Sequence, residues 1–128
     1  MMLRASVAGA ALVLASFYAQ PAAAISEADF AMKTTAQMQT LCAAEEGETF
    51  FLEGRSACYG FIRGIAEFYG ELVRAGEATS KVCSDEELTV DQIRVAFLTW
   101  AEANPDAGDA SPVDSFLRSA IATWPCDA

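Results

Sequence analysis

The stretch Cys58-Tyr59-Gly60-Phe61-Ile62-Arg63-Gly64-Ile65-Ala66-Glu67 decides the fold, because every other helix and cysteine of the chain can be placed relative to it. It reads as the first half of a helix that opens on a cysteine. The helix is expected to span residues 55–75 and to stop at Gly76. Apolar side chains recur along it at helical spacing and predict a wide buried face, so this is the central helix: Phe61, Ile62, Ile65, Phe68, Tyr69, Leu72 and Val73.

Two glycines stand four residues apart inside this helix. Gly60 and Gly64 each cost about 1 kcal/mol relative to alanine, so we expect another helix to approach the backbone closely there. Arg63 lies between them, four residues before Glu67. The spacing favours a surface ion pair between these two side chains, and a polar contact to a partner is the alternative.

Three further helices are expected, at residues 26–44, 89–104 and 111–124. Ser26, Thr89 and Ser111 are the residues that should begin them, since each hydroxyl can cap a helix and Pro112 suits a first helical position. The sequence contains no strand-like alternation and no internal repeat. We therefore predict an all-α fold, a small four-helix bundle that is either orthogonal or up-and-down. The side chains expected to face inward in these helices are Phe30, Thr34, Met38, Leu41, Cys42, Ile93, Ala96, Phe97, Trp100, Val113, Phe116, Leu117, Ala120, Ile121 and Trp124.

The N-terminus has the pattern of a secretory signal peptide. Arg4 precedes an apolar run over residues 7–18, and Ala22-Ala23-Ala24 supplies small residues for cleavage. The run is shorter than the roughly 20 residues that a bilayer-spanning helix needs, which argues against a membrane anchor. We expect residues 1–24 to be removed and residues 25–128 to form one exported domain, with no membrane anchor after cleavage.

Four cysteines remain in that domain, and an even number in an oxidising compartment predicts two disulfides. Four cysteines allow three pairings, which the sequence alone cannot distinguish. In an up-and-down bundle Cys42 would lie near Cys58 and Cys83 near Cys126, so those two pairs are preferred. By the chain-entropy model their loops would contribute about 3 and 4 kcal/mol.

The composition argues against catalysis and nucleic-acid binding. The chain has no histidine, eight basic and 18 acidic residues, and a net charge of −10 that becomes about −11 once Arg4 is removed. Such a charge repels nucleic acid and favours cationic partners, although solubility alone also accounts for it. Without histidine, a free thiol or a clustered ligand set, we predict no enzyme activity, no metal and no cofactor. Glu67 and Glu71 read as solvated charges of a helix surface rather than as an acid–base pair.

Two acidic connections are the best candidates for binding a protein partner. The first, residues 45–53, contains Glu46, Glu48 and two adjacent aromatic residues, Phe50 and Phe51. These aromatic side chains either anchor a partner or fold back over the core, and the second interpretation is favoured. The second connection is the turn that contains Asp106 and Asp109.

The chain resembles the Rap/Tai group of type VI secretion immunity proteins over nearly all of residues 25–128. The stretch 58–67 is similar to that family's C-x-G-Y-I-x-G-x-x-D signature, and residues 120–126 resemble its closing A-L-x-x-A-F-P-C. Residues 89–93 and 100–105 are similar to its third helix start and end. Glu67 in place of aspartate, Asn104 in place of histidine and the absence of a Cys-x-Pro before the third helix depart from the pattern.

The resemblance implies a periplasmic immunity protein that binds and inhibits a type VI secretion effector, typically a peptidoglycan amidase. The partner would thus be a secreted cell-wall hydrolase, and a homodimer is also implied because several family members form one. The resemblance carries over no catalytic residues and no effector contacts. The alternatives are a periplasmic acid-stress chaperone, an envelope adaptor protein, or an immunity-like protein without a toxin partner.

Overall fold

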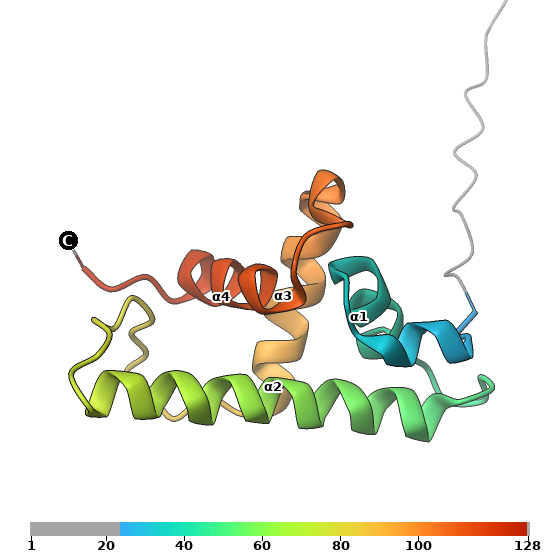
Figure 1. Ribbon diagram of the computed structural model, residues 1–128, viewed down its shortest axis with the longest axis horizontal. Helices are drawn as coiled ribbons and strands as arrows, with labels where there is room; N and C mark the ends of the chain where they lie inside the picture. The colour runs from blue at the N-terminus through green and yellow to red at the C-terminus, as the bar shows by residue number, and fades with distance from the viewer. Residues whose placement is uncertain (1–23, 128) are drawn as a thin grey trace, which may run out of the picture.

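The computed structural model describes residues 24–127, and Figure 1 shows their arrangement. Nearly all of the predicted signal peptide lies outside the described residues, so it stays a prediction. Apart from one isolated bridge between Val82 and Pro125, the regular structure of the described part is helical. The predicted all-α fold is confirmed. The elements in chain order are η1 (Glu27–Ala31), α1 (Thr35–Cys42), α2 (Phe51–Arg74), α3 (Val90–Ala103), η2 (Pro105–Ala107) and α4 (Pro112–Thr123).

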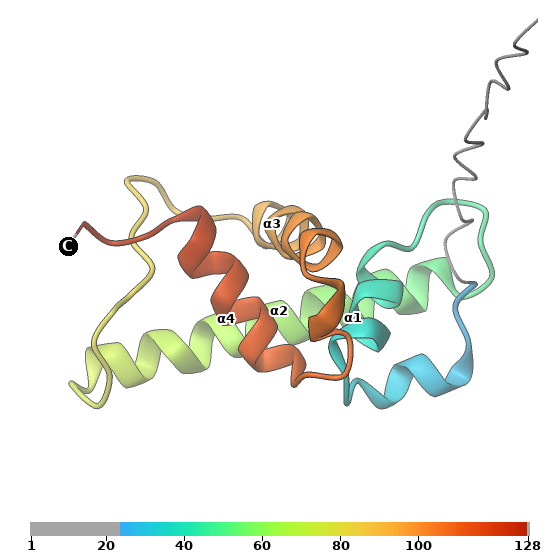
Figure 2. The ribbon, with the colours of Figure 1, turned by 90° about the horizontal axis from the view of Figure 1, so that it is seen from above.

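The helices are arranged orthogonally rather than up and down. Figure 1 shows α2 as a long base along one side of the molecule, with α3 running steeply away from it. Seen from above, α4 lies obliquely over the second half of α2, while α1 packs near its first half (Figure 2). None of the described helices is both long and apolar enough to cross a membrane.

The prediction of one helix over residues 26–44 is wrong, because this segment forms two helices, η1 and α1. Met32 adopts a left-handed conformation (φ 48°) and separates η1 from α1. Two capping sequences compete here: Ser26 with Asp29 begins η1, and Thr34 with Gln37 begins α1. Thr34 therefore caps α1 instead of facing the core along its stripe.

The central helix begins four residues earlier than predicted, at Phe51, so half of the expected connector is helical. Gly54 explains how this first turn packs against α1. A Cβ atom on Gly54 would lie 3.0 Å from Ile25 Cδ1 and 3.5 Å from Leu41 Cδ2. At Gly60 and Gly64, by contrast, a Cβ atom would meet nothing within 4 Å. The expectation of close helix approach at those two glycines is wrong, and Gly54 is where it occurs.

The last two helices begin where the capping residues predict. Thr89 accepts a hydrogen bond from the backbone N–H of Gln92 (3.2 Å) at the start of α3. Pro112 is the first residue of α4 and follows Ser111. At α3 the capping side chain satisfies a backbone donor whatever the helix packs against. At α4 the Ser111 side chain makes no capping hydrogen bond, and the start follows from Pro112, whose fixed φ suits the first helical position.

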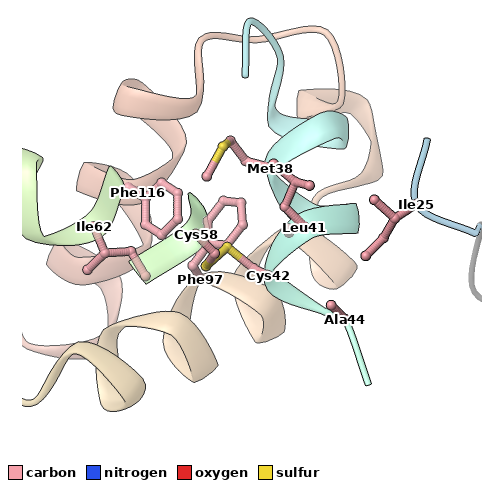
Figure 3. Packing of buried hydrophobic residues seen from close by; sticks show 10 residues of the cluster. Ile25, Met38, Leu41, Cys42, Ala44, Cys58, Ile62, Phe97 and Phe116 are labelled. Carbon is pink, nitrogen blue, oxygen red and sulfur yellow. A yellow bond between two sulfur atoms is a disulfide. The ribbon is translucent and has the colours of Figure 1, made fainter. Parts of the chain in front are cut away.

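The core lies where α1, the first half of α2, α3 and α4 meet (Figure 3). Phe97 of α3 stacks on Phe116 of α4 with ring centroids 3.8 Å apart, and both rings are buried. This core does not extend along the second half of α2. Phe68 is 67% exposed and Val113 is 43% exposed, so both depart from their predicted inward orientation. Other members of the core are Ile25, Met38, Leu41, Cys42, Ala44, Cys58, Ile62 and Ala101.

Both disulfides join the pairs that the sequence analysis preferred. Cys42–Cys58 is fully buried and ties the end of α1 to α2. Cys83–Cys126 ties the connection between α2 and α3 to the C-terminal segment, next to a hydrogen bond from Cys83 N–H to the Trp124 carbonyl (2.9 Å). Both pairings arise in an orthogonal array, although an up-and-down bundle is the arrangement that predicts them.

Candidate functional site

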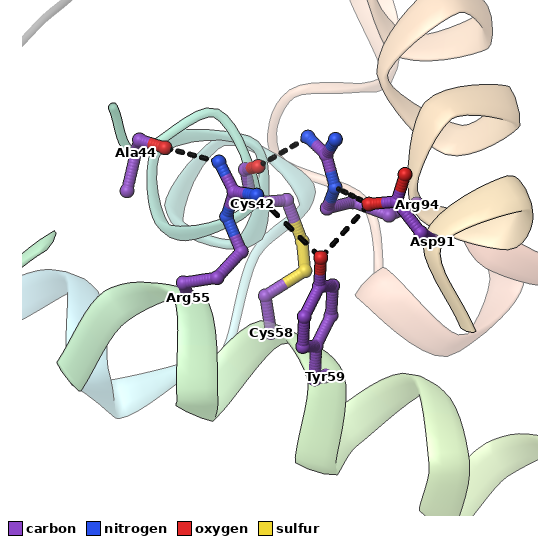
Figure 4. The surroundings of a disulfide bond; sticks show 7 residues. All are labelled: Cys42, Ala44, Arg55, Cys58, Tyr59, Asp91 and Arg94. Atoms are coloured by element: carbon purple, nitrogen blue, oxygen red, sulfur yellow. Dashed lines mark hydrogen bonds and ion pairs between the residues drawn. A yellow bond between two sulfur atoms is a disulfide. The ribbon is translucent and has the colours of Figure 1, made fainter. Parts of the chain in front are cut away.

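Two arginines surround the buried disulfide and terminate α1 (Figure 4). Arg55 of α2 donates a hydrogen bond to the Ala44 carbonyl, and Arg94 of α3 donates one to the Cys42 carbonyl (3.0 Å). The Cys42 carbonyl is the last of α1, has no partner inside the helix and carries partial negative charge, so the Arg94 guanidinium stabilises it. The Ala44 carbonyl lies just beyond the helix and its C-cap. The two arginines thereby join α2 and α3 to the end of α1.

Asp91 completes this group from the first turn of α3. It accepts hydrogen bonds from Arg94 Nε (2.7 Å) and from the Tyr59 hydroxyl (2.8 Å). These two hydrogen bonds, the one from Arg94 first, lower the pKa of Asp91 below its ordinary value. A carboxylate held in its ionised form is the opposite of a general acid poised near neutral pH. The cluster is therefore a structural joint between three helices.

The acidic connection between α1 and α2 is exposed, but its aromatic residues are not free. Phe50 is 37% exposed and its ring meets Phe30 edge-on, with centroids 6.0 Å apart. Phe51 is half-buried beneath the guanidinium of Arg55, which lies 5.5 Å from the ring centroid. Both rings contact the protein itself, as the interpretation that they fold back expects. The charged part of the connection remains on the surface.

The structure brings the second acidic turn to the other end of α1. Backbone N–H groups of Thr35 and Ala36 donate to the carbonyls of Ala110 and Gly108, both at 2.9 Å. This turn, with Asp106 and Asp109 exposed, therefore adjoins the start of α1, whereas the connection with Glu46 and Glu48 follows its end. An eight-residue helix is about 12 Å long, so the two acidic loops flank a short spacer.

A third acidic region is formed by segments that are remote in the sequence. Asp85, Glu86 and Asp127 surround a hollow of about 560 Å³, with Trp124 in its wall. The run Ser84-Asp85-Glu86-Glu87 was a visible charge signal. Its gathering with Asp127 depends on the Cys83–Cys126 disulfide, which brings the C-terminal segment alongside it. The sequence alone does not place these two segments together.

Among residues 24–127 no group of histidine, cysteine, aspartate or glutamate side chains could hold a metal ion. The ion pair between Arg63 and Glu67 is present, at 3.8 Å between Arg63 Nη2 and Glu67 Oε1, and both side chains are exposed. It is the surface ion pair that the spacing favours. The described residues thus form a helical domain with two disulfides and exposed acidic loops. These features are typical of small disulfide-bonded binding proteins.

Comparison with known protein families identifies which kind of binding protein this is. The family model of the Rap1a immunity proteins matches residues 34–126, so the chain belongs to that family. No curated protein and no solved structure matches the chain. Membership confirms the family resemblance seen in the sequence and implies a type VI effector immunity protein. Such a protein has a protein effector as its partner and acts as an inhibitor by binding it. The disulfides are compatible with an extracytoplasmic location.

Proposed function

We propose that the chain is a periplasmic immunity protein that binds and inhibits a peptidoglycan amidase delivered by a type VI secretion system. Family membership supports the immunity role. Two disulfides support a location where thiols are oxidised. An amidase fits the charge of the chain, because an enzyme that acts on the anionic cell wall gains from a basic surface, and this chain is strongly acidic.

The observation that carries the binding mode is the pair of acidic loops at the two ends of α1. Glu46, Glu48, Asp106 and Asp109 are all exposed, and none of them takes part in an ion pair within the described residues. Glu48 also holds its loop in shape, since its carboxylate accepts a hydrogen bond from the Glu45 N–H (2.7 Å). Unpaired acids on fixed loops are the groups that a basic enzyme surface meets first.

The mechanism we infer is occlusion guided by charge. The acidic loops attract the effector electrostatically. The α1 helix and its flanking loops then cover the substrate cleft of the enzyme. Charge attraction of this kind raises the association rate more than it raises the final affinity, and added salt weakens it. The Cys42–Cys58 disulfide constrains the loop at the end of α1, and the hydrogen bonds from Thr35 and Ala36 hold the turn at its start, which limits the entropy lost on binding.

The test requires a search of the genes beside the one for this chain for a secreted hydrolase, which is then used as the candidate effector. The hydrolase is directed to the periplasm of a host cell, with and without the immunity chain, and growth and co-purification are measured. A fourfold variant, E46Q/E48Q/D106N/D109N, removes four charges while keeping the side-chain shapes. We expect it to slow association at least tenfold at low salt and to reduce protection.

A matched variant, E77Q/D85N/E86Q/E87Q, removes the same number of charges from the connection between α2 and α3 and should still protect. If both variants lose protection equally, net charge alone acts and the assignment to the α1 loops is wrong. If the native chain neither binds nor neutralises the hydrolase, the amidase-immunity proposal is wrong for that partner. In that case, protection of unrelated proteins from aggregation at about pH 2 would favour the chaperone alternative.

A further inference from the structure

The helices α2, α3 and α4 enclose an apolar cavity of about 270 Å³, which we call the α2–α4 cavity. Its walls come from these three helices and from the connection between α2 and α3. Tyr69 is the one lining residue with a polar atom in its side chain. The cavity is partly open to solvent, and Ile65, Leu88 and Ile93 in its wall are only half-buried. Such a wall contacts water in the free chain and gains from an apolar ligand.

Small side chains on two of the helices leave this space open. The helix α4 packs closely against α3, where Phe116 stacks on Phe97, but only lightly against α2. Ala66 of α2 and Ala120 of α4 both line the cavity, and neither fills it. Protein interiors contain few voids larger than a water molecule. A space of this size between three helices is therefore a feature that packing alone does not explain.

The wall that the connection between α2 and α3 provides is cross-linked. Val82 in this wall pairs with Pro125 in an isolated bridge, and the neighbouring Cys83 forms the disulfide with Cys126. The Cys83 N–H also donates to the Trp124 carbonyl (2.9 Å). Figures 1 and 2 show the connection and the C-terminal segment close together. The disulfide thus keeps this wall in place before a ligand arrives, which limits the entropy lost on binding.

The cavity has a buried end and an exposed end. Ile62 and Phe116, which line the first, are both buried, whereas Tyr69 and Leu88 are half-buried. Ile62 and Tyr69 are seven residues apart on α2, so the lining extends over about 10 Å of the helix. A ligand with a flexible apolar chain and a polar group at one end matches this arrangement. Its chain reaches Ile62, and its polar group lies near Tyr69.

The polar atoms near Tyr69 indicate the chemistry of that polar group. The Tyr69 hydroxyl accepts a hydrogen bond from the Lys81 N–H (2.8 Å), and within residues 24–127 it donates none. Its proton is thus available to a ligand. Lys81 carries a positive charge and takes part in none of the ion pairs of the described residues. A carboxylate accepts from a hydroxyl and pairs with an ammonium group, so it suits both residues.

The volume of the cavity sets the length of the apolar chain. An apolar cavity of about 150 Å³ accepts the six carbon atoms of benzene. By proportion, a cavity of about 270 Å³ accepts roughly ten carbon atoms. A phospholipid with two long acyl chains is too large, and the net charge of −10 also repels anionic membrane surfaces. A single chain of medium length is the occupant that fits.

We propose that the α2–α4 cavity binds a free medium-chain fatty acid of about ten carbons, with its alkyl chain between α2 and α4 and its carboxylate at Tyr69 and Lys81. The site does not depend on the proposed amidase partner, because no residue of α1 or of its flanking loops lines it. We expect a dissociation constant on the order of 100 µM for decanoate, since a ligand of about twelve heavy atoms has few contacts to offer.

The experiment is a titration of the disulfide-bonded chain of residues 25–128 with saturated fatty acids of six to fourteen carbons. It is done in 0.15 M NaCl, which screens the net charge beyond about 8 Å. Calorimetry measures affinity, which should rise about fourfold with each added methylene up to about ten carbons and then level off, because further carbons remain in water. Methyl NMR signals of Ile65, Ile93 and Leu117 should shift, while those of Leu52 and Val95, exposed elsewhere, should not.

Two variants test the two ends of the site. Ala120→Leu fills the cavity and should weaken decanoate binding at least tenfold, while the unfolding temperature stays equal or rises. Its matched control is Ala122→Leu, an exposed position on α4 outside the cavity, which should leave binding unchanged. Lys81→Gln should weaken octanoate and decanoate binding at least fivefold but leave 1-octanol binding unchanged, because only a carboxylate interacts with the charge. Lys33→Gln, which removes a charge just before α1, should change none of these affinities.

A chain that binds none of these acids at twentyfold the expected dissociation constant overturns the proposal. So does an affinity that keeps rising to fourteen carbons, or decanoate binding that survives both Ala120→Leu and Lys81→Gln. If 1-octanol binds as tightly as octanoate, the carboxylate plays no part and the assignment of a fatty acid is wrong. If the chain binds vesicles of phosphatidylethanolamine and phosphatidylglycerol but not free decanoate, it recognises a membrane surface and the proposal is wrong.

Discussion

The half of α2 from Phe51 to Ile62 packs against α1 and α3, whereas the half from Gly64 to Arg74 borders an open groove. Their apolar residues have the same helical spacing. The two halves differ in the contacts that hold neighbouring helices against them. The first half has a buried disulfide, the close approach at Gly54 and the hydrogen bonds that two arginines donate to backbone carbonyls. The second half has none of these contacts. The helical spacing of the apolar residues identifies a face that could be buried. The contacts made by the disulfide, by Gly54 and by the two arginines determine which part of that face is buried.

The largest difference between the two regions should come from phenylalanine truncation. Phe97→Ala removes a fully buried ring that stacks on Phe116, and should lower the free energy of unfolding by about 3–5 kcal/mol. Phe68→Ala removes a ring that is 67% exposed in the single chain, and should change it by less than about 0.5 kcal/mol. Urea unfolding of the two variants and of the native chain measures both changes. Equal losses would mean that the second half of α2 is packed after all.

Removal of the disulfides should give the next largest effect. The chain-entropy model assigns about 3 kcal/mol to Cys42–Cys58, with a sequence separation of 16, and about 4 kcal/mol to Cys83–Cys126, with a separation of 43. In C42A/C58A the lost sulfur atoms also leave space in the core, so its cost should equal or exceed that of C83A/C126A. Urea unfolding measures the two free energies.

Hydrogen exchange then separates the two disulfide variants. C83A/C126A should expose the backbone amides at positions 83 and 126, which in the native chain are hydrogen-bonded across the two segments, while α1 and the first half of α2 stay protected. Protection lost throughout the molecule in both variants would contradict a division into a packed and an open region.

A smaller effect should come from the glycines. Gly64→Ala should raise the free energy of unfolding by about 1 kcal/mol, because alanine favours helix and nothing lies within 4 Å of the added Cβ atom. Gly54→Ala should gain less or lose stability, since its Cβ atom would lie 3.0 Å from Ile25 Cδ1 and push against Leu41. Thermal unfolding at low concentration compares them. A larger gain at Gly54 than at Gly64 would mean that the close approach of α1 is not real.

These contrasts also show what the sequence can predict here. Helix starts at Thr89 and Pro112 follow from local chemistry, and local chemistry is present in the sequence. The apolar stripe does not predict the break at Met32, because it runs on through two consecutive capping sequences and fits a single helix. The role of Gly54 could not be predicted, because it depends on Ile25 and Leu41, which are distant in the chain.

The candidate site divides in the same way. The acidic character of both α1 loops is visible as residue types, and their exposure follows from it. That the two loops lie at opposite ends of one short helix required the hydrogen bonds from Thr35 and Ala36 to the turn near Gly108. The hollow around Asp85 and Asp127 likewise depends on a disulfide between remote cysteines. The sequence shows which residues are acidic. It does not show which acidic segments lie close together in the fold.

The smallest expected effect concerns Asp91, which joins α3 to α2 in the packed region. Hydrogen bonds from Arg94 and Tyr59 lower the pKa of Asp91 in the folded chain below its ordinary value of 3.8. A lowered folded pKa means that the unfolded chain binds the proton more readily, so the stability that Asp91 contributes is present above about pH 4 and is lost as the pH falls through the folded pKa. Because more than half of the Asp91 side chain is exposed, we expect only about 0.5 kcal/mol. Urea unfolding of the native chain and of Asp91→Asn should differ by that amount at pH 6, and the difference should shrink as the pH falls below about 4. Tyr59→Phe removes one of the two donors and should reduce the pH-dependent part of the free energy of unfolding.

A difference in the free energy of unfolding between the native chain and Asp91→Asn that stays constant from pH 6 to pH 2 would contradict this prediction. It would show that the carboxylate charge plays no part in holding α3 against α2.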